Sequence, residues 1–540
     1  MRHIEIATRA SARDDIAQRL AGQFYTPHII ANRLAHELLG QPLQPRTIGD
    51  PFCGDGRLVT VWLSLAQAKR PTALRKLRKI VLWDFDARAV QAATVSVRAQ
   101  LRSIGLTDCE VIAKVHDTFR QTIAPPFQMD LIVTNPPWEL LKPDTRDGIS
   151  EHSVATYVRS IREYTSELAG ILPGSASAKG KAMAGYAVNL ARAGMLASIR
   201  LASPLAKLGI VLPASIFADQ ASTPFRRELF EALAVERISW YPAEVRLFDG
   251  VDQPFVTMIA RRDGPTDRFT LQRMTVDLEE LDRRTVVPDV RGGGPIAFAV
   301  NGRQEEILKR LTISHPPLRL FEEDLRFGLW LGRELDETRL GDWTTTNGQG
   351  VPFLKGRYVF PYRIEHHEPL RIDPRRRDIP ITVREKRLAW RDVSRPTQKR
   401  RMHVALVPDS WVTGNSLGVA FFRYGSVERI LVLLAVLNSF SFEIQLRAKL
   451  ATAHVSQGIL RQCSIPEAVF SHRPTMEFML NAVRRQLVDR PGNDGALACL
   501  EAFIARAYGM RRDEFETILS AFPKLEHGER DCLLAKGLWS

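Results

Sequence analysis

Three aspartates stand at or just beyond the ends of short β-rich runs, where their side chains can meet at one binding site. Asp50 ends TIGD, Asp84 ends KIVLWD, and Asp117 comes two residues after CEVIAKV. If these runs are neighbours in one parallel sheet, the carboxylates converge at its carboxyl edge, where α/β sheets bind ligands. They would suit a nucleoside that carries a positive centre. Each aspartate alone is also a favoured helix N-cap, which is the structural alternative.

The segment DPFCGDG at 50–56 adds glycines to the first of these strand ends. Gly54 and Gly56 allow the backbone to approach a ligand closely, and the helix expected at 57–68 offers free N–H groups at its start. The Asp84 carboxylate can accept hydrogen bonds from both hydroxyls of a ribose, and Asp117 can accept one from the amino group of an adenine. The glycines alone are a weak signal, because an ordinary strand-to-helix turn needs them too.

A second chemical motif, NPPW, follows the β-rich run MDLIVT at 129–134 and consists of Asn135, Pro136, Pro137 and Trp138. The amide oxygen of Asn135 and the carbonyl of Pro136 can accept both N–H bonds of an exocyclic amine, which exposes the nitrogen lone pair for attack. The prolines hold these acceptors rigidly before the reaction begins. Trp138 offers a stacking face for a base taken out of its helix. The alternative is a plain turn.

Alternating β-rich and helical segments between residues 46 and 262 must position these residues. Strands are expected at 47–50, 79–84, 109–115, 129–134, 208–213, 237–241 and 254–262, and helices at 57–68, 86–101 and 222–234. This alternation predicts an α/β fold with a mostly parallel, doubly wound sheet. Only a short loop separates the last two strands, so we expect the final strand to be antiparallel.

DPFCGDG followed by NPPW resembles the adenine-N6 DNA methyltransferases that use S-adenosyl-L-methionine. GQFYTPHIIANRLAHELL at 22–39 resembles their FxTP element, and the motif order is that of the gamma arrangement in type II restriction–modification. The resemblance implies a Rossmann-like methyltransferase sheet with an antiparallel last strand. It further implies that Trp138 stacks on a flipped adenine, and that S-adenosyl-L-methionine is bound by Tyr25, Thr26, Pro27, Asp50, Pro51, Gly54, Gly56, Asp84, Asp117 and Asn135. Phe52 and Asp55 depart from the family pattern, and the role of Asp55 stays open.

Composition and motifs predict three domains. We expect a catalytic domain at 1–300, a mixed α/β target-recognition domain at 301–470, and a helical region at 471–540, with a boundary near the GGG at 292–294. The polar, Ala/Gly/Ser-rich segment 174–185 has linker composition. The second domain resembles target-recognition domains of modification enzymes in the order of its FLKG, RLAWRD, LAVLNS and HVSQGILRQCSIP segments, at 353–356, 387–392, 434–439 and 454–466.

The methyl acceptor is not determined by NPPW, because related motifs serve methyltransferases acting on protein glutamine or on guanine in ribosomal RNA. The formal net charge is +14, and residues 371–403 hold twelve Arg or Lys against four Asp or Glu. Basic residues interleaved with aromatics favour double-stranded DNA as the partner. We expect phosphate contacts from Lys355, Arg387, Arg391, Lys399, Arg400 and Arg401. The alternative is a solvated charged face.

Other features limit the function classes. The five cysteines form no CxxC pair, and the adjacent His366 and His367 lack ligand spacing, so no metal is expected. The chain has no signal-like start, and its longest apolar run, 430–442, is too short for a bilayer, which predicts a cytoplasmic bacterial or archaeal protein without a membrane partner. About twenty residues precede the FxTP element, so we expect any restriction endonuclease on a separate chain. Two alternative functions are a DNA-binding subunit of a larger defence complex and an RNA adenine methyltransferase.

Overall fold

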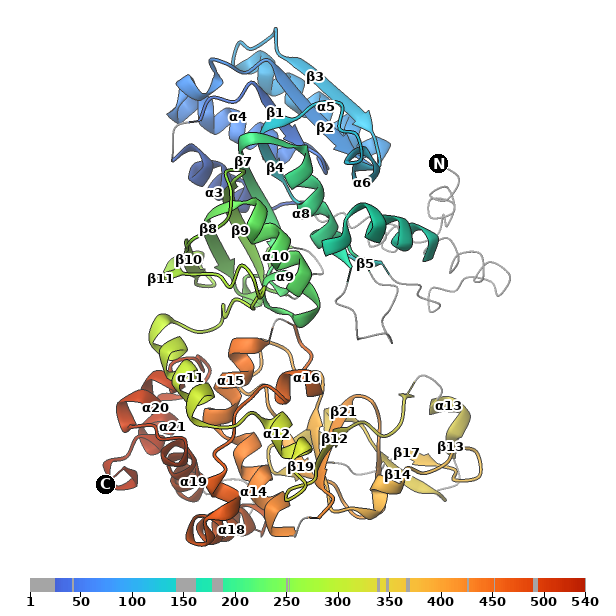
Figure 1. The fold of residues 1–540 in the computed structure, drawn as a ribbon, viewed down its shortest axis with the longest axis vertical. Coiled ribbons are helices and arrows are strands. Elements are labelled where there is room, and N and C mark those ends of the chain that lie inside the picture. The colour runs from blue at the N-terminus through green and yellow to red at the C-terminus, as the bar shows by residue number, and fades with distance from the viewer. Residues whose placement is uncertain are drawn as a thin grey trace. The chain divides into compact units, whose positions relative to one another are not determined.

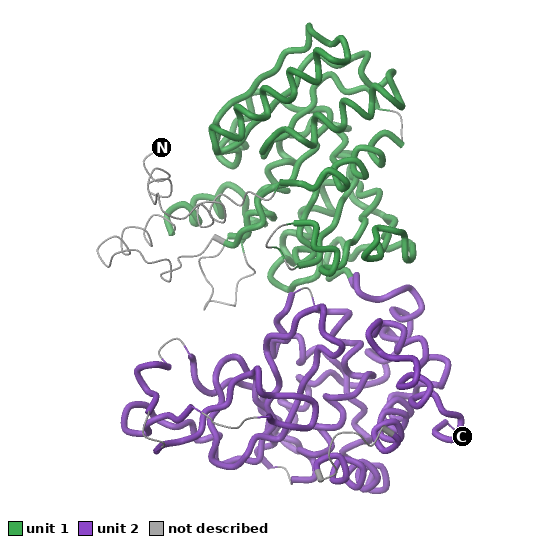
Figure 2. Tube along the Cα trace, turned by 180° about the vertical axis from the view of Figure 1, so that it is seen from behind, with its two compact units in different colours: residues 1–296 green, residues 297–540 purple. Residues whose placement is uncertain are grey.

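The computed structural model describes most of the chain, namely residues 25–40, 43–141, 162–176, 188–248, 251, 253–337, 340–345, 349–365, 370–424, 427–450, 452–488 and 494–539. The chain divides into two compact units, Met1–Ile296 and Ala297–Ser540 (Figure 2). The functional division into domains at 1–300, 301–470 and 471–540 stays a prediction. His366, His367, the start of the FxTP element and most of the segment at 174–185 lie outside the described residues.

The described residues of unit 1 form a nine-stranded sheet in the order β11-β10-β8-β9-β7-β4-β1-β2-β3 (Figure 1). The strands are β1 (Thr47–Asp50), β2 (Lys79–Asp84), β3 (Glu110–Val115), β4 (Met129–Thr134), β7 (Ala202–Pro213), β8 (Ala234–Tyr241), β9 (Phe255–Arg261), β10 (Phe269–Met274) and β11 (Glu280–Val286). Strands β3, β2, β1, β4 and β7 are parallel neighbours. Strand β9 runs antiparallel between β7 and β8, which confirms the predicted fold class.

Two strands that sequence reasoning did not predict extend this sheet beyond β8. Strand β10 pairs parallel with β8, and β11 pairs antiparallel with β10. The sequence of β11, ELDRRTV, is mostly charged and largely exposed, as an edge strand usually is. A charged strand with little apolar alternation gives a weak sequence signal.

Helices flank the parallel part of the sheet. They are α3 (His28–Leu39), α4 (Arg57–Lys69), α5 (Ala87–Ser103), α6 (Thr118–Gln121), α8 (Leu190–Leu201) and α10 (Thr223–Ala232), with a further helix over residues 162–171. Apolar residues spaced three or four apart bury one face of α5, and Asp86 caps its start by accepting the N–H of Arg88. Helix α4 packs between α3 and α5, whereas α8 contacts α6 and α10. This arrangement leaves the carboxyl edge of the parallel strands to the loops that carry the predicted motifs.

Unit 2 combines short strands with a helical core. Its described residues form the sheets β12-β21-β18-β19 and β13-β17-β14-β20. Their strands are β12 (Leu329–Gly332), β13 (Thr344–Thr345), β14 (Val351–Leu354), β17 (Leu370–Ile372), β18 (Leu388–Arg391), β19 (Val404–Leu406), β20 (Val412–Thr413) and β21 (Leu417–Phe422). The main helices are α11 (Gly302–Ser314), α14 (Val427–Asn438), α15 (Phe440–Lys449), α18 (Arg473–Val488), α19 (Asp494–Ala507) and α20 (Arg512–Leu519). One hydrophobic core reaches from Val300 to Leu534, so the carboxyl-terminal helices pack with the first of these sheets.

No helix in the described part of the chain combines the length and apolar content that a bilayer span requires.

Candidate functional site

The carboxyl edge of the parallel sheet brings the predicted motifs together. Asp50 and Asp84 are the last residues of β1 and β2, which are adjacent strands. Asp117 follows β3, the next strand outward, and Asn135 follows β4 on the other side of β1. Four consecutive positions in the sheet therefore present a carboxylate or an amide at one edge.

The glycine loop after β1 closes against the end of β2. The backbone N–H of Gly54 donates to Asp84 Oδ2 at 2.9 Å, and Asp84 Oδ1 accepts the N–H of Asp86 at 3.0 Å. Gly54 and Gly56 have φ values of 49° and 78°, in the left-handed region that favours glycine. A Cβ atom on Gly54 would lie 3.1 Å from the ring of Tyr25. The loop thus needs glycine for its conformation as well as for close approach.

Asp55, whose role the sequence left open, holds the arginine that connects the glycine loop to the TP residues of the FxTP element. Its Oδ2 atom pairs with Arg57 Nη2 at 2.7 Å. Arg57 Nη1 then donates to the backbone carbonyl of Thr26 at 3.0 Å. The next residue, Pro27, accepts the N–H groups of Ile30 and Ala31 at the start of α3. Asp55 therefore has a positioning role in this structure.

Asp50 lies beneath the loop rather than at its surface, with an exposed fraction of 1%. Thr134 Oγ1 donates to Asp50 Oδ1 at 2.6 Å, and the N–H of Phe52 donates to the same oxygen at 3.1 Å. Burial raises the pKa of Asp50 to about 7. The Pro51 carbonyl also accepts the Thr118 hydroxyl. Asp50 and Pro51 thus connect the glycine loop to the residue before Asn135 and to α6, while their direct contact with a cofactor stays a prediction.

Asp117 takes the helix-capping role that was considered for it, while its contact with an adenine amino group stays a prediction. It caps α6 by accepting the N–H of Phe119 at 3.1 Å, and its other oxygen accepts the hydroxyl of Tyr164 at 3.0 Å. Burial raises the pKa of both Asp84 and Asp117, so both carboxylates favour a cationic neighbour.

Tyr164 belongs to the helix over residues 162–171, which sequence reasoning missed. Arg120 makes a two-pronged contact with Glu167 of the same helix, at 2.9 and 2.7 Å. Tyr164 and Glu167 are three residues apart and so lie on one helix face. This spacing is the sequence signal that could have predicted the helix.

Pro136 of the NPPW segment packs against a glycine of α8. A Cβ atom on Gly194 would lie 2.4 Å from Pro136 Cβ, so any larger residue there would displace the motif. The N–H of Leu190, at the start of α8, donates to the carbonyl of Glu139 at 2.9 Å. The sequence analysis did not identify Gly194, because its importance comes from this packing against Pro136 and not from a motif of its own.

Trp138 lies in a cluster of aromatic rings at the same edge of the sheet. Its ring centroid is 4.7 Å from that of Phe248, which lies in the loop between β8 and β9, and 6.1 Å from that of Phe255. Phe255 stacks on Tyr241 with centroids 4.6 Å apart. Trp138 has an exposed fraction of 9%, while Asn135 and Pro137 are half-buried. Amide and carbonyl acceptors therefore lie directly beside an apolar, aromatic wall.

Three of the arginines that were predicted to contact DNA have partners inside unit 2. Arg387 and its partner Glu334 are both fully buried, with 2.7 Å between Nε and Oε1. Arg400 pairs with buried Glu443 at 2.7 Å, and Arg401 donates to the Thr452 carbonyl at 2.7 Å. These guanidinium groups bind acceptors in the interior of unit 2, and their contact with phosphates stays a prediction.

The electrostatics of Glu443 show how strong this internal pairing is. Burial alone would raise its pKa, but Arg400 and Arg447 on either side hold it at about 2. The carboxylate remains charged inside the unit and keeps both arginines in place.

The other three side chains that were predicted to contact DNA are at least partly exposed. Arg391 donates to the carbonyls of Gly356 and Val359, at 3.1 and 2.8 Å. Lys355 lies 3.7 Å from Glu337, and Lys399 pairs with Glu529 at the surface. Their contact with DNA stays a prediction.

Two other arginines of unit 2 are exposed and lie beside aromatic side chains. The Arg377 guanidinium lies 4.8 Å from the ring centroid of Trp343, and that of Arg357 lies 4.8 Å from the ring centroid of Tyr358. Both arginines are exposed. Counting charges along the chain did not separate them from the buried arginines.

Comparison with known proteins gives this edge of the sheet a family context. Residues 12–156, which include the glycine loop and NPPW, match the model of the N-6 DNA methylase family. Residues 12–156 are called the methylase segment below, after the family whose model they match. No curated protein matches the chain.

Solved structures resemble the protein beyond the methylase segment. The type IIL restriction-modification enzyme MmeI, solved in complex with DNA, is 12% identical with a TM-score of 0.54, covering 94% of this chain and 74% of that one. A nuclease-deletion mutant of the type ISP enzyme LlaGI, with a DNA substrate mimic, is 11% identical with a TM-score of 0.53, covering 90% of this chain and 48% of that one. At such identities the likeness shows the fold alone.

A third structure indicates how the lengths compare. The modification subunit of a putative type I restriction enzyme from Vibrio vulnificus YJ016 is 16% identical, with a TM-score of 0.34 over 54% of this chain. The chain covers 51% of that subunit, which is about half of its length.

Proposed function

We propose that this protein is a site-specific DNA adenine-N6 methyltransferase that uses S-adenosyl-L-methionine, and that it is the modification enzyme of a restriction–modification or phage-defence system. The observation that carries the proposal is the placement of Asp84, Asp117 and the NPPW motif along one sheet edge within unit 1. The methylase segment at 12–156 supports the reaction class. The cognate endonuclease, if the system has one, is proposed to be a separate chain.

The glycine loop and the carboxylates of the carboxyl edge support binding of the proposed cofactor. The left-handed glycines bring the loop backbone next to Asp84, whose carboxylate oxygens each keep a lone pair for a ribose hydroxyl. Asp117 can accept a hydrogen bond from the amino group of the cofactor's adenine. This bond would be added to the one from the Tyr164 hydroxyl or would replace it. When bound there, S-adenosyl-L-methionine would supply an electrophilic methyl group on a positively charged sulfur.

The residues of NPPW would prepare the acceptor nitrogen of adenine. Asn135 and the Pro136 carbonyl accept the two N–H bonds of the amine, which draws its lone pair out of conjugation and toward the methyl group. Packing of Pro136 on Gly194 fixes these acceptors, so their geometry does not have to form during the reaction. Transfer leaves a positively charged nitrogen whose proton is then acidic enough to pass to water, so no strong general base is required.

The aromatic wall would hold the flipped base. Trp138 and Phe248 present rings whose planes meet at 49°, with Trp138 on the motif itself and Phe248 on a neighbouring loop. Stacking on aromatic side chains stabilises an extruded base by about 1–3 kcal/mol per ring. The base would displace part of the contact between these two rings as it enters.

The experiment that tests this function is methyl transfer by the purified protein. Labelled S-adenosyl-L-methionine is offered with unmodified genomic DNA, with RNA, and with a protein extract, and the modified product is hydrolysed for mass spectrometry. We expect label in DNA as N6-methyladenine. Label in RNA or in protein, with none in DNA, would contradict the proposal and support one of the other acceptors of NPPW-type enzymes.

A further inference from the structure

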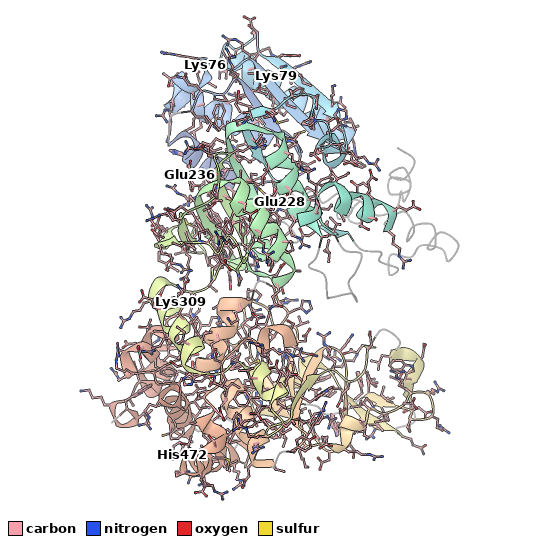
Figure 3. The ribbon with its side chains drawn as sticks, viewed as in Figure 1. Lys76, Lys79, Glu228, Glu236, Lys309 and His472 are labelled. Atoms are coloured by element: carbon pink, nitrogen blue, oxygen red, sulfur yellow. The ribbon has the colours of Figure 1, made fainter. Side chains whose placement is uncertain are left out.

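A basic cavity lies at the amino edge of the sheet in unit 1, opposite the edge that carries the proposed active site. Its volume is about 270 Å³, and it is lined by Arg46, Thr47, Lys76, Arg78 and Lys79. Lys76 and Lys79 are labelled in Figure 3, close together on the same part of the unit. Four of the five lining side chains are therefore cationic, and the fifth is a hydroxyl.

The backbone holds these cations close together. The Arg46 carbonyl accepts the N–H groups of both Arg78 and Lys79, at 2.9 and 3.1 Å. Thr47 is the register partner of Lys79 where β1 and β2 begin. The N–H groups of Arg46 and Thr47 both donate to Asp130 Oδ2, at 2.8 and 3.1 Å. The cluster is thus part of the sheet edge rather than a set of independent loop side chains.

Carboxylates neutralise little of this charge. Within the described part of the chain, no ion pair joins a carboxylate to Arg46, Lys76 or Arg78, all of which are exposed. Arg78 Nη1 donates to the Leu77 carbonyl at 2.8 Å and more weakly to that of Arg75. Lys79 lies 3.4 Å from Glu110, whose side chain is 60% exposed. A surface pair of this kind contributes little.

Asp130 also lies at this edge, and its oxygens accept hydrogen bonds from backbone N–H groups and from a serine hydroxyl. Oδ2 takes the two backbone N–H groups of the cavity wall, and Oδ1 accepts the Ser203 hydroxyl at 2.9 Å. Like charges held in one cavity repel one another, and a bound anion relieves that repulsion. The local chemistry therefore favours an anionic ligand.

This cavity is separate from the cofactor and adenine site. Arg46 precedes β1 and Lys79 begins β2, whereas Asp50 and Asp84 end the same strands. A strand rises about 3.3 Å per residue, so strands of this length separate the two edges by roughly 10–16 Å. A ligand in the basic cavity is thus a different group from the one that would occupy the glycine loop.

The lining residues favour phosphate over a protein surface. Arginine, lysine and threonine hydroxyl groups are the side chains that contact the phosphates of DNA. Protein interfaces instead centre on buried aromatic or aliphatic anchors, and none of the described residues that line this cavity has a large apolar side chain. We propose that the basic cavity binds backbone phosphates of a DNA segment outside the methylation target. The inference rests on the proposed function in taking DNA as the partner.

The test compares the double variant Lys76→Ala/Arg78→Ala with a charge-matched control, Arg484→Ala/Arg485→Ala on α18, whose arginines are also exposed. Binding of full-length protein to a 40-base-pair duplex of random sequence is measured by fluorescence anisotropy between about 50 and 300 mM KCl. Each lost phosphate contact should lower the slope of log affinity against log salt by about 0.9, so we expect a decrease of about 1.8. The Kd at 0.1 M salt should rise on the order of tenfold.

Thermal unfolding and calorimetric titration with S-adenosyl-L-methionine show whether each variant is folded and keeps its proposed cofactor site. An equal loss of DNA affinity in the control would mean that the effect comes from net charge and not from the cavity, and it would overturn the proposal. An unchanged slope in the cavity variant would overturn it as well. Titration with tripolyphosphate separates the phosphate sources: cavity-dependent binding of tripolyphosphate with unchanged DNA binding would assign the cavity to a small phosphate ligand instead.

Methyl transfer is not a readout of this test, so the two proposals can fail independently. A protein that transfers no methyl group but shows the cavity-dependent salt slope would contradict the proposed function and keep the DNA-binding cavity. If instead the protein methylates DNA and the wild type and cavity variant share the same salt slope, the proposed function stands and the DNA-binding cavity is contradicted.

Discussion

The carboxyl edge of the sheet in unit 1 and the basic segment 371–403 of unit 2 are both rich in charge, yet they use it differently. Asp84 and Asp117 at the sheet edge are partly buried, and they accept hydrogen bonds from the glycine loop and from Tyr164. Arg387 and Arg400 in the basic segment point inward and pair with Glu334 and Glu443. The first region is organised around a site, and the second is largely organised around its own core.

The difference comes from how position along the chain relates to position in space. Residues that end neighbouring parallel strands must lie at one edge, so strand order alone places Asp50, Asp84 and Asn135 together. No such rule says whether an arginine in a mixed, turn-rich segment faces water or a buried carboxylate. Motif order therefore predicts which residues share the sheet edge, whereas a count of charges does not predict which arginines are exposed.

The buried pair of unit 2 gives the largest expected effect. Arg387→Ala leaves Glu334 charged and unpaired in the interior, which should lower the free energy of unfolding of unit 2 by about 3–5 kcal/mol. Urea unfolding followed by tryptophan fluorescence measures the change. Lys386→Ala is the matched control, because the neighbouring lysine pairs with Asp409 at the surface and its loss should cost less than about 1 kcal/mol. Equal effects for both variants would mean that Arg387 is not the internal anchor that we describe.

Asp50 tests whether the fully buried acid of unit 1 behaves differently from Asp84 and Asp117, which are only partly buried. Its pKa is about 7 when folded, far above that of an unfolded aspartate, because burial disfavours the charged form. Folded protein therefore holds a proton that the unfolded chain has released, and this contribution to stability is present at low pH and lost as pH rises through 7.

Asp50→Asn copies the protonated form and removes that dependence. Relative to this variant, the wild type should lose about 1.4 kcal/mol of unfolding free energy per pH unit between about pH 5 and 7. Denaturation of both proteins at several pH values measures the difference. A constant difference would contradict the assignment. At pH 8 the variant should be the more stable protein but should bind the cationic cofactor less tightly.

Much of the fold and of the site was predictable from the residues. Strands β1–β4 and β7–β9 and their parallel or antiparallel senses followed from βα alternation, and NPPW follows the strand next to the one that leads into the glycine loop. Gly194 and Tyr164 were not predictable, because their roles come from what α8 and the helix at 162–171 pack against. The burial of Arg387 was hidden for the same reason, since its partner Glu334 is more than fifty residues away along the chain.

The ribose assignment predicts a binding effect of intermediate size. Asp84→Asn keeps an oxygen for the Gly54 N–H but removes the negative charge. Hydrogen bonds to charged groups contribute about 1.5–3 kcal/mol, so calorimetry should show cofactor affinity reduced by at least tenfold. Asp108→Ala, in an exposed position before β3, is the control and should bind as the wild type does. Unchanged affinity in Asp84→Asn would count against a ribose contact.

The smallest effect is expected from an exposed arginine of unit 2. Arg377→Ala removes a guanidinium that stacks on Trp343, at the surface. If this arginine contacts one DNA phosphate, the salt slope should fall by about 0.9, while stability changes by less than about 0.5 kcal/mol. Anisotropy titrations and urea unfolding measure the two quantities. A large loss of stability without a change of slope would place Arg377 with the structural arginines.

The central claim is that NPPW prepares an adenine of DNA for methyl transfer. Modification-sensitive long-read sequencing of DNA from cells expressing the protein, or its Asn135→Ala variant, tests this most directly. The account predicts N6-methyladenine in one sequence context with the wild type and none with Asn135→Ala, although calorimetry finds that the variant still binds S-adenosyl-L-methionine. Methylation that persists in Asn135→Ala, or a different modified base in the wild type, would contradict it.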